Sequence, residues 1–114
     1  MMSYKNTYLR FVNLMIAAEE LSDLPSLDSV ETRILKLLSI HWEKNNPITV
    51  AEAMRISDEA SASTMFRYLK KLRHKGYLQL VIDKSDNRVK YVEATNQTDK
   101  YFCELGKLMH LAVG

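Results

Sequence analysis

The chain has 114 residues, of which 46% are hydrophobic and 26% charged, and it carries a net charge of +2. This length and composition fit one small globular core and exclude a chain that is largely disordered. The sequence holds no long uncharged apolar run, no N-terminal signal core and a single cysteine, so we expect a cytoplasmic protein with no membrane partner.

The N-terminal region predicts a helix from Tyr4 to Leu21. Apolar residues recur there at spacings of three and four, and Asp23 and Pro25 then break the pattern. The apolar stripe of this helix is wide for the surface of so small a domain.

Two capping boxes follow along the chain. Asp28 stands three residues before Glu31, and Thr49 stands three residues before Glu52. The first box predicts a helix that ends near residue 44, and the second predicts a short helix from 50 to about 56. The longer helix is expected to have one apolar side, formed by Val30, Ile34, Leu37, Leu38 and Trp42.

A further helix is predicted from Ala62 to about Lys75, after a polar turn at 57–60. Ser61 can cap its N-terminus, and Gly76 stands where a left-handed C-terminal cap is needed. The residues of this helix that face inward are expected to be Met65, Leu69 and Leu72.

The C-terminal third predicts a hairpin and a last helix. Two runs rich in β-branched and aromatic residues, Tyr77–Ile82 and Val89–Ala94, predict strands joined by the polar turn 83–88. Thr95 or Thr98 then caps a helix that runs to about residue 112. One face of that helix is expected to consist of Phe102, Leu105, Met109 and Ala112.

This order of elements predicts a mainly α protein with a small β-hairpin, which is a winged helix-turn-helix. We expect an N-terminal helix in 1–26, the winged helix-turn-helix domain in 27–94 and a C-terminal helix in 95–114. Because one small domain can leave the stripes of the two outer helices uncovered, we expect both to pack in a homodimer. The alternative is that each helix folds over its own domain. The expected dimer interface consists of Tyr4, Tyr8, Phe11, Val12, Met15, Phe102, Leu105 and Met109.

Charge is unevenly distributed along the chain. Residues 61–92 carry eight basic and two acidic side chains, a net +6, whereas 1–60 sum to −3 and 93–114 to −1. A basic segment inside a nearly neutral chain favours a polyanionic partner, although a solvated lysine-rich helix face is the simpler alternative.

The basic segment contains two elements suited to double-stranded DNA. Small hydroxyls near the start of the helix after Ser61 let it enter a major groove, and Arg67 can pair with guanine through two hydrogen bonds. At the hairpin tip Arg88 can enter a minor groove, and Asp86 can hold the tip in shape by accepting backbone hydrogen bonds. A solvated helix face and a solvated turn are the alternatives. The candidate DNA-binding residues are Ser61, Ser63, Thr64, Arg67, Tyr68, Lys71, Lys84, Asp86, Arg88 and Lys90, with further phosphate contacts from Lys70 and Lys75.

The sequence offers no pattern typical of a catalytic, metal or cofactor site. His41, His74 and His110 lie far apart, and none stands in a metal-binding motif. Cys103 lies among apolar residues of the last helix and is expected to be a buried, inert thiol, with a redox switch as the alternative. We therefore predict that the protein is not an enzyme and needs no cofactor.

Two segments resemble the multiple antibiotic resistance regulator (MarR) family of winged-helix proteins. Residues 61–78 resemble the family's recognition helix, which ends in a Leu, charged residues, Gly and an apolar pair. Residues 83–88 resemble its wing signature, Asp-x-x-Asp-x-Arg, and Thr95 follows at about the usual distance. The resemblance extends from about Leu27 to Leu108 and implies a homodimeric DNA-binding transcription regulator, often a repressor.

The resemblance also implies roles for single residues. Arg88 would enter the minor groove with Asp86 as its positioning partner, and the helix contacts would fall on Ser61, Ser63, Thr64, Arg67 and Tyr68. Members of the family usually have a further C-terminal helix that completes the dimer arch, whereas this chain stops near Gly114. The resemblance therefore does not imply the family's dimer geometry, half-site spacing or usual ligand pocket for this chain.

The leading hypothesis is a sequence-specific double-stranded DNA-binding regulator that acts as a homodimer and represses transcription. The alternative is a winged-helix module for protein–protein interaction or assembly that does not bind DNA. A small-molecule effector stays open as a third partner, but no residue pattern supports one.

Overall fold

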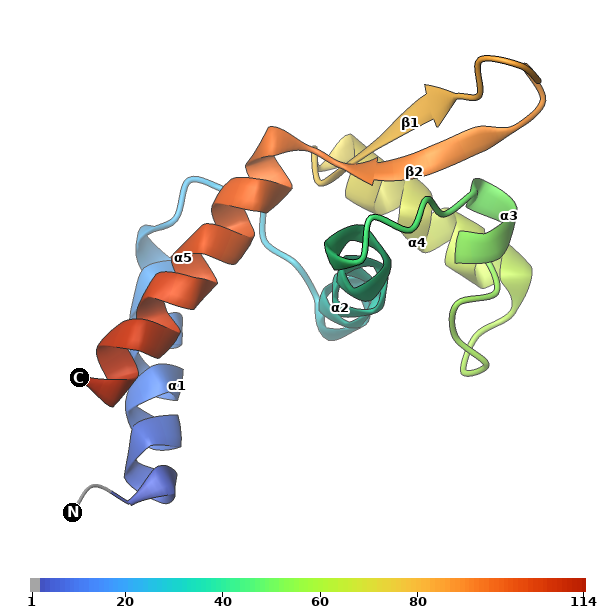
Figure 1. Cartoon of the computed structure of the whole chain (residues 1–114). Coiled ribbons are helices and arrows are strands. Elements are labelled where there is room, and N and C mark those ends of the chain that lie inside the picture. Colours follow the sequence, from blue (N-terminus) through green and yellow to red (C-terminus); the bar gives the residue numbers. More distant parts are fainter. Residues whose placement is uncertain (1–2) are drawn as a thin grey trace. The chain divides into compact units, whose positions relative to one another are not determined.

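The computed structural model describes residues 3–114 and shows a mainly helical chain with one antiparallel hairpin (Figure 1). The predicted fold class is confirmed. The elements in chain order are α1 (Tyr4–Leu21), α2 (Ser29–Glu43), α3 (Val50–Ala53), α4 (Ala62–His74), β1 (Leu78–Ile82), β2 (Lys90–Ala94) and α5 (Asn96–Val113).

The chain divides into two compact units. The central unit is Leu27–Thr98 and contains α2, α3, α4 and the hairpin, together with the first turn of α5. The second unit consists of α1 and Asp99–Gly114.

The core of the central unit lies where α2 and α4 meet the hairpin. The three predicted inward residues of α4 are buried, with Leu72 fully so. On α2 the prediction is partly wrong, because Leu35 is 1% exposed and Val30 is 38% exposed. The buried stripe of α2 contains Glu31, Ile34, Leu35 and Leu38 at helical spacing, and Val30 lies at its flank.

Caps determine where the helices of this unit begin. Asp28 Oδ1 accepts from Glu31 N at 2.8 Å while Glu31 Oε1 accepts from Asp28 N at 2.9 Å, so the predicted box is formed. The box of Thr49 and Glu52 is formed in the same way. The helix that Thr49 caps, however, is shorter than predicted and ends at Ala53. Backbone bonds change there from the i−4 to the i−3 carbonyl, as in a tightening last turn.

The hairpin is joined to the helices by backbone bonds. Val92 N donates to Ile48 O at 2.9 Å, and the indole Nε1 of Trp42 donates to Val92 O at 3.1 Å. Gly76 has φ +86°, the left-handed cap that the sequence predicts between α4 and β1. Two hydrogen bonds join the start of α5 to the segment after α4. Gln97 Nε2 donates to Lys75 O, and Thr95 Oγ1 donates to Gly76 O. Thr95 rather than Thr98 caps α5, since Thr98 N donates to Thr95 Oγ1 at 3.3 Å.

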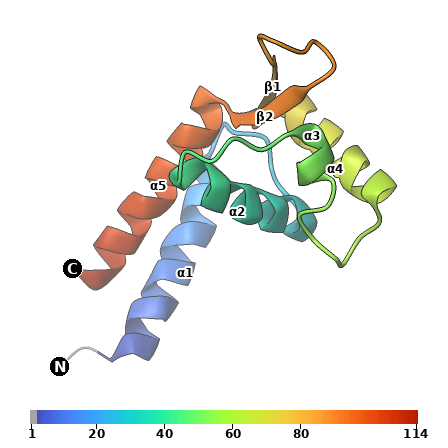
Figure 2. The same cartoon turned by 45° about the vertical axis from the view of Figure 1, so that its right-hand side comes forward.

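The second unit is a pair of helices that lie side by side in both views (Figures 1 and 2). Ala112 of α5 is 1% exposed, whereas α1 contains no buried residue. Arg10 of α1 donates to the carbonyl oxygen of Leu111 near the C-terminal end of α5. Within the described residues, no helix is both long and apolar enough to cross a bilayer.

Candidate nucleic-acid interface

The first turn of α4 gathers the three predicted hydroxyls. Ser61 Oγ accepts from Thr64 N at 3.2 Å and donates to Thr64 Oγ1 at 2.9 Å. Ser63 Oγ lies 3.2 Å from Ser61 Oγ, and its residue is exposed. The Ser61 and Thr64 hydroxyls therefore stabilise the helix start, and the exposed Ser63 is the hydroxyl of the three that remains for outside contacts.

The outward face of α4 carries cations opposite its buried side. Arg67 and Lys71 are exposed, and they follow Ser63 and each other at helical spacing. Tyr68 is half-buried at the edge of this face, with Lys71 Nζ 5.1 Å from the centre of its ring. This cation–π contact between Lys71 and Tyr68 restrains the lysine side chain.

Lys75, the expected phosphate ligand at the end of α4, has a different role. Its Nζ lies 2.6 Å from the Oε1 of Glu31, whose side chain is 1% exposed. The ion pair joins the end of α4 to the start of α2, so this ammonium is engaged with the protein. The expectation that Lys75 contacts phosphate is therefore not supported by its surroundings.

The tip of the hairpin holds Arg88 through Asp86. Arg88 N and Nε both donate to Asp86 Oδ1 at 3.0 Å, and its NH2 group donates to Oδ2 at 3.2 Å. These bonds lower the pKa of Asp86, and the side-chain bonds from Arg88 have the largest effect. The backbone bond was predicted from the sequence, and the paired side-chain bonds fit the positioning partner that the resemblance implies for Arg88. The guanidinium is held in one orientation although the Arg88 side chain is 90% exposed.

Asp83, the first residue of the wing signature, organises the same turn, a role that was not predicted from the sequence. Its Oδ2 accepts from Ser85 N, Ser85 Oγ and Asp86 N at 2.9–3.0 Å. Its Oδ1 accepts from the Tyr91 hydroxyl at 3.2 Å. Bonds from Ser85, above all, lower the pKa of Asp83, and the bond to Asp83 raises the pKa of Tyr91. An aspartate two residues before a serine in a polar turn is the signal that predicts such a turn.

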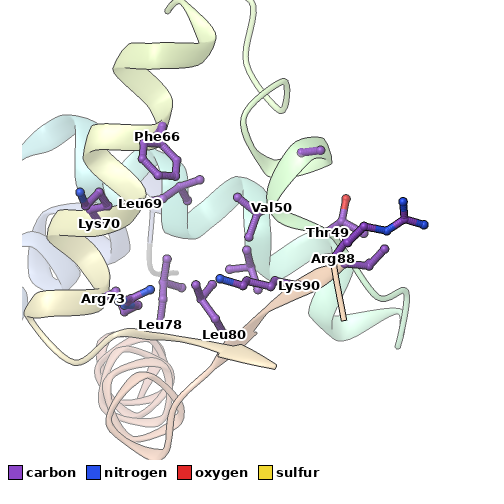
Figure 3. Close-up of a pocket in the computed structure, with 13 residues that line it drawn as sticks. Thr49, Val50, Phe66, Leu69, Lys70, Arg73, Leu78, Leu80, Arg88 and Lys90 are labelled. Carbon is purple, nitrogen blue, oxygen red and sulfur yellow. The ribbon is translucent and has the colours of Figure 1, made fainter. Parts of the chain in front are cut away.

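A groove separates α4 from the hairpin, with α3 at one end (Figure 3). Its cavity measures about 480 Å³ and has an apolar lining that includes Phe66, Leu69 and Leu80. Lys90 and Arg88 line it too, and the guanidinium of Arg88 points away from it in Figure 3. Lys84, the remaining cation of the tip, is exposed. Phe66 and the groove were not predicted, because a groove depends on how two elements meet.

The residues predicted for a dimer interface all lie in the second unit, and they differ in exposure. Tyr4 is 94% exposed, Tyr8 63% and Met109 58%. The others are half-buried: Phe11, Val12, Met15, Phe102 and Leu105. This unit therefore combines a partly covered apolar seam with large apolar side chains that face solvent.

The expectation for Cys103 is wrong, since its residue is exposed. It lies on α5 one turn after Asp99 and Lys100 and one turn before Lys107, all exposed, so it shares their polar face. Among residues 3–114, no three His, Cys, Asp or Glu side chains are grouped so that they could hold a metal ion.

Comparison with known proteins shows the fold. No protein-family model matches the sequence, and no curated protein matches it. The transcriptional regulator Tm0710 from Thermotoga maritima superposes with a TM-score of 0.65 at 14% identity, over 94% of this chain and 67% of its own. A mutant of MarR from Escherichia coli complexed with operator DNA gives 0.54 at 18% identity, over 95% and 69%.

A third solved structure, the heme sensor PefR from Streptococcus agalactiae in complex with heme, gives a TM-score of 0.56. It is 22% identical, over 95% of this chain and 77% of its own. The chain therefore has the winged-helix fold of MarR-like transcriptional regulators, as the resemblance of its sequence implies.

Proposed function

We propose that this protein is a transcriptional regulator that binds double-stranded DNA as a homodimer, and that it is not an enzyme. Helix α4 enters the major groove and the hairpin tip enters the adjacent minor groove. The observation that carries the proposal is Arg88, which Asp86 holds in a fixed orientation while its side chain stays 90% exposed. An oriented, solvent-facing guanidinium on a narrow hairpin suits a minor groove, where the negative potential is greatest.

The residues of α4 and of the hairpin tip have different roles in this proposal. Arg67 reads a base edge, with Ser63 beside it, and Arg88 reads the minor groove. Lys70, Lys71, Lys84 and Lys90 are exposed, and they neutralise phosphates. Most of the affinity then comes from phosphate contacts and most of the discrimination from the two arginines.

The homodimer is part of the proposal because α1 and α5 carry large exposed apolar side chains. Tyr8 and Met109 are more than half exposed, whereas a monomer rarely leaves much contiguous apolar surface in water. Two α1–α5 pairs that pack together would cover these side chains. A dimer would also place two recognition helices on one duplex.

The similar structures support the regulatory role. The MarR mutant is complexed with operator DNA, and Tm0710 is a transcriptional regulator. PefR binds heme, and DNA binding by BpsR from Bordetella bronchiseptica is regulated by 6-hydroxynicotinic acid. We propose repression as the mode of action and assign no effector to this chain.

Selection of bound sequences from a random pool of DNA tests the proposal. We expect an enriched palindromic site whose two halves lie one helical turn apart, because a two-fold dimer places its recognition helices at that spacing. An enriched site without palindromic symmetry would overturn the homodimer. A pool that shows no enrichment in physiological salt would overturn DNA binding and leave a protein-interaction module as the function.

A further inference from the structure

Phe66 is an aromatic side chain that the core of α4 does not use. Its neighbour Met65 is 1% exposed and Leu69 is 7% exposed, whereas Phe66 is 42% exposed. It lies one residue from Arg67 and on the side of α4 that borders the groove to the hairpin (Figure 3). Part of the phenyl ring therefore faces solvent at the groove, where a partner can contact it.

One cation lies over this ring, and two more line the groove beside it. Lys70, one turn later on α4, places its Nζ 5.5 Å from the centre of the phenyl ring. Arg73 and Lys90 line the same groove. These cations favour a partner that combines negative charge with an apolar group that the phenyl side chain can reach.

Duplex DNA offers one such apolar group in its major groove. All other groups on the base edges are hydrogen-bond donors or acceptors, and only thymine adds a C5-methyl group. Phosphates on either side of that methyl supply the negative charge that the surrounding cations require. An aromatic or aliphatic side chain commonly contacts this methyl in known complexes.

We infer that Phe66 is a specificity-determining residue that recognises the C5-methyl of a thymine next to the base pair read by Arg67. This inference rests on the proposed DNA binding and adds to it the chemistry of one base. Lys70 packs against the ring and limits its rotation, and its ammonium faces a phosphate. The site in each half of the operator then contains one thymine whose methyl contributes to binding.

The test replaces thymine by uracil, which differs only in lacking the methyl. Each thymine of the selected operator is changed in turn, symmetrically in both halves, and the dissociation constant is measured by fluorescence anisotropy. At one position we expect uracil to weaken wild-type binding by about three- to fourfold per half-site, because one buried methyl contributes that much to affinity. Phe66→Ala should bind the thymine and uracil operators equally, and Phe66→Leu should keep part of the difference.

Val81→Ala is the matched control. Val81 is an apolar side chain of similar exposure, 38%, on β1, and it does not line the groove. This variant should keep the wild-type preference for thymine. Circular dichroism of each variant confirms that the helices are intact, and Phe66→Leu provides the comparison should Phe66→Ala unfold.

Two results would overturn the inference and leave DNA binding in place. One is a wild type that binds the operator but shows no loss with uracil at any position. The other is a Phe66→Ala or Phe66→Leu protein that binds the operator with the full preference for thymine. A wild type that binds no duplex would overturn the proposed function itself.

Discussion

At the hairpin tip, two aspartates three residues apart have different effects. Asp83 accepts three hydrogen bonds from Ser85 and Asp86 and so shapes the backbone of the turn. Asp86 instead pairs with the side chain of Arg88. The Asp83 carboxylate shapes the backbone of the loop, and the Asp86 carboxylate orients the guanidinium that we propose enters DNA.

Replacement of Arg88 tests the role of the tip. Arg88→Ala should weaken operator binding by about tenfold or more per half-site, because a positioned guanidinium is lost from the minor groove. Arg88→Lys should not restore the affinity, because an ammonium lacks the planar fork that pairs with both oxygens of Asp86. Anisotropy titrations measure both. Lys36→Ala, on the exposed side of α2, serves as a charge-matched control. Equal losses for Arg88→Ala and Lys36→Ala would contradict the prediction.

The pKa values of the tip predict its pH dependence. Hydrogen bonds lower the pKa of Asp83 and of Asp86 below the ordinary value of 3.8. A lowered folded-state pKa means that the ionised carboxylate stabilises the tip above pH 3.8, and that this stabilisation is lost as the pH falls through the folded pKa.

We therefore expect the tip to keep its structure from neutral pH down to about pH 4 and to loosen only below that. Amide NMR shifts of Ser85 and Arg88, followed from pH 7 to pH 2, measure the transition. Asp83→Asn should loosen the Ser85 amide at neutral pH. A midpoint above pH 3.8 in the wild type would contradict the hydrogen bonds that we describe.

At the scale of an element, α4 is fixed at both ends. Ser61 caps its start, and its last turn is joined to Glu31 of α2 by the ion pair with Lys75. Gly76 then reverses the chain into β1 with φ +86°. The orientation of α4 therefore depends on the contacts at its two ends, which lie outside its exposed face.

Two glycine substitutions separate backbone strain from helix propensity. Gly76→Ala should destabilise the protein by about 1–2 kcal/mol, because φ is positive there. An added Cβ would also lie 2.8 Å from Gln97 Oε1. At Gly106 of α5 a Cβ meets nothing within 4 Å, so Gly106→Ala should stabilise by about 0.5–1 kcal/mol. Urea unfolding measures both changes, and a neutral Gly76→Ala would contradict the left-handed cap.

For the whole molecule, the proposed homodimer predicts a mass in solution of twice the 13.2 kDa of one chain. Tyr8→Asp with Met109→Asp should give a monomer, because charges would replace two exposed apolar side chains of the second unit. Sedimentation at micromolar concentration measures the mass. Ile40→Asp, which changes a side chain of α2 that is 52% exposed, is the control and should leave a dimer. A wild type that sediments as one chain would contradict the proposal.

Salt dependence tests the dimer on DNA by a separate route. If each subunit neutralises about four phosphates, the logarithm of affinity should fall with the logarithm of salt concentration at a slope of about −7 for a dimer. Lys84→Ala should reduce the magnitude of that slope by about 1–2, because one phosphate contact is lost from each subunit. A slope near zero would contradict an electrostatic interface.

Much of this fold follows from short-range patterns. The capping boxes at Asp28 and Thr49, the cap at Ser61 and the left-handed Gly76 each depend on residues within four positions, so the sequence alone predicts them. The inward residues of α4 follow from helical periodicity for the same reason. The bond from Asp86 to the Arg88 amide is equally local.

The remaining features depend on which elements meet, and only the tertiary structure decides that. Leu35 is buried and Cys103 exposed because of the neighbours that each helix face has in space. Lys75 pairs with Glu31, which lies 44 residues away, and the groove beside Phe66 exists because α4 packs against the hairpin. Periodicity shows that a helix has an apolar face, but the side chains it contacts are determined by packing between segments distant in the chain.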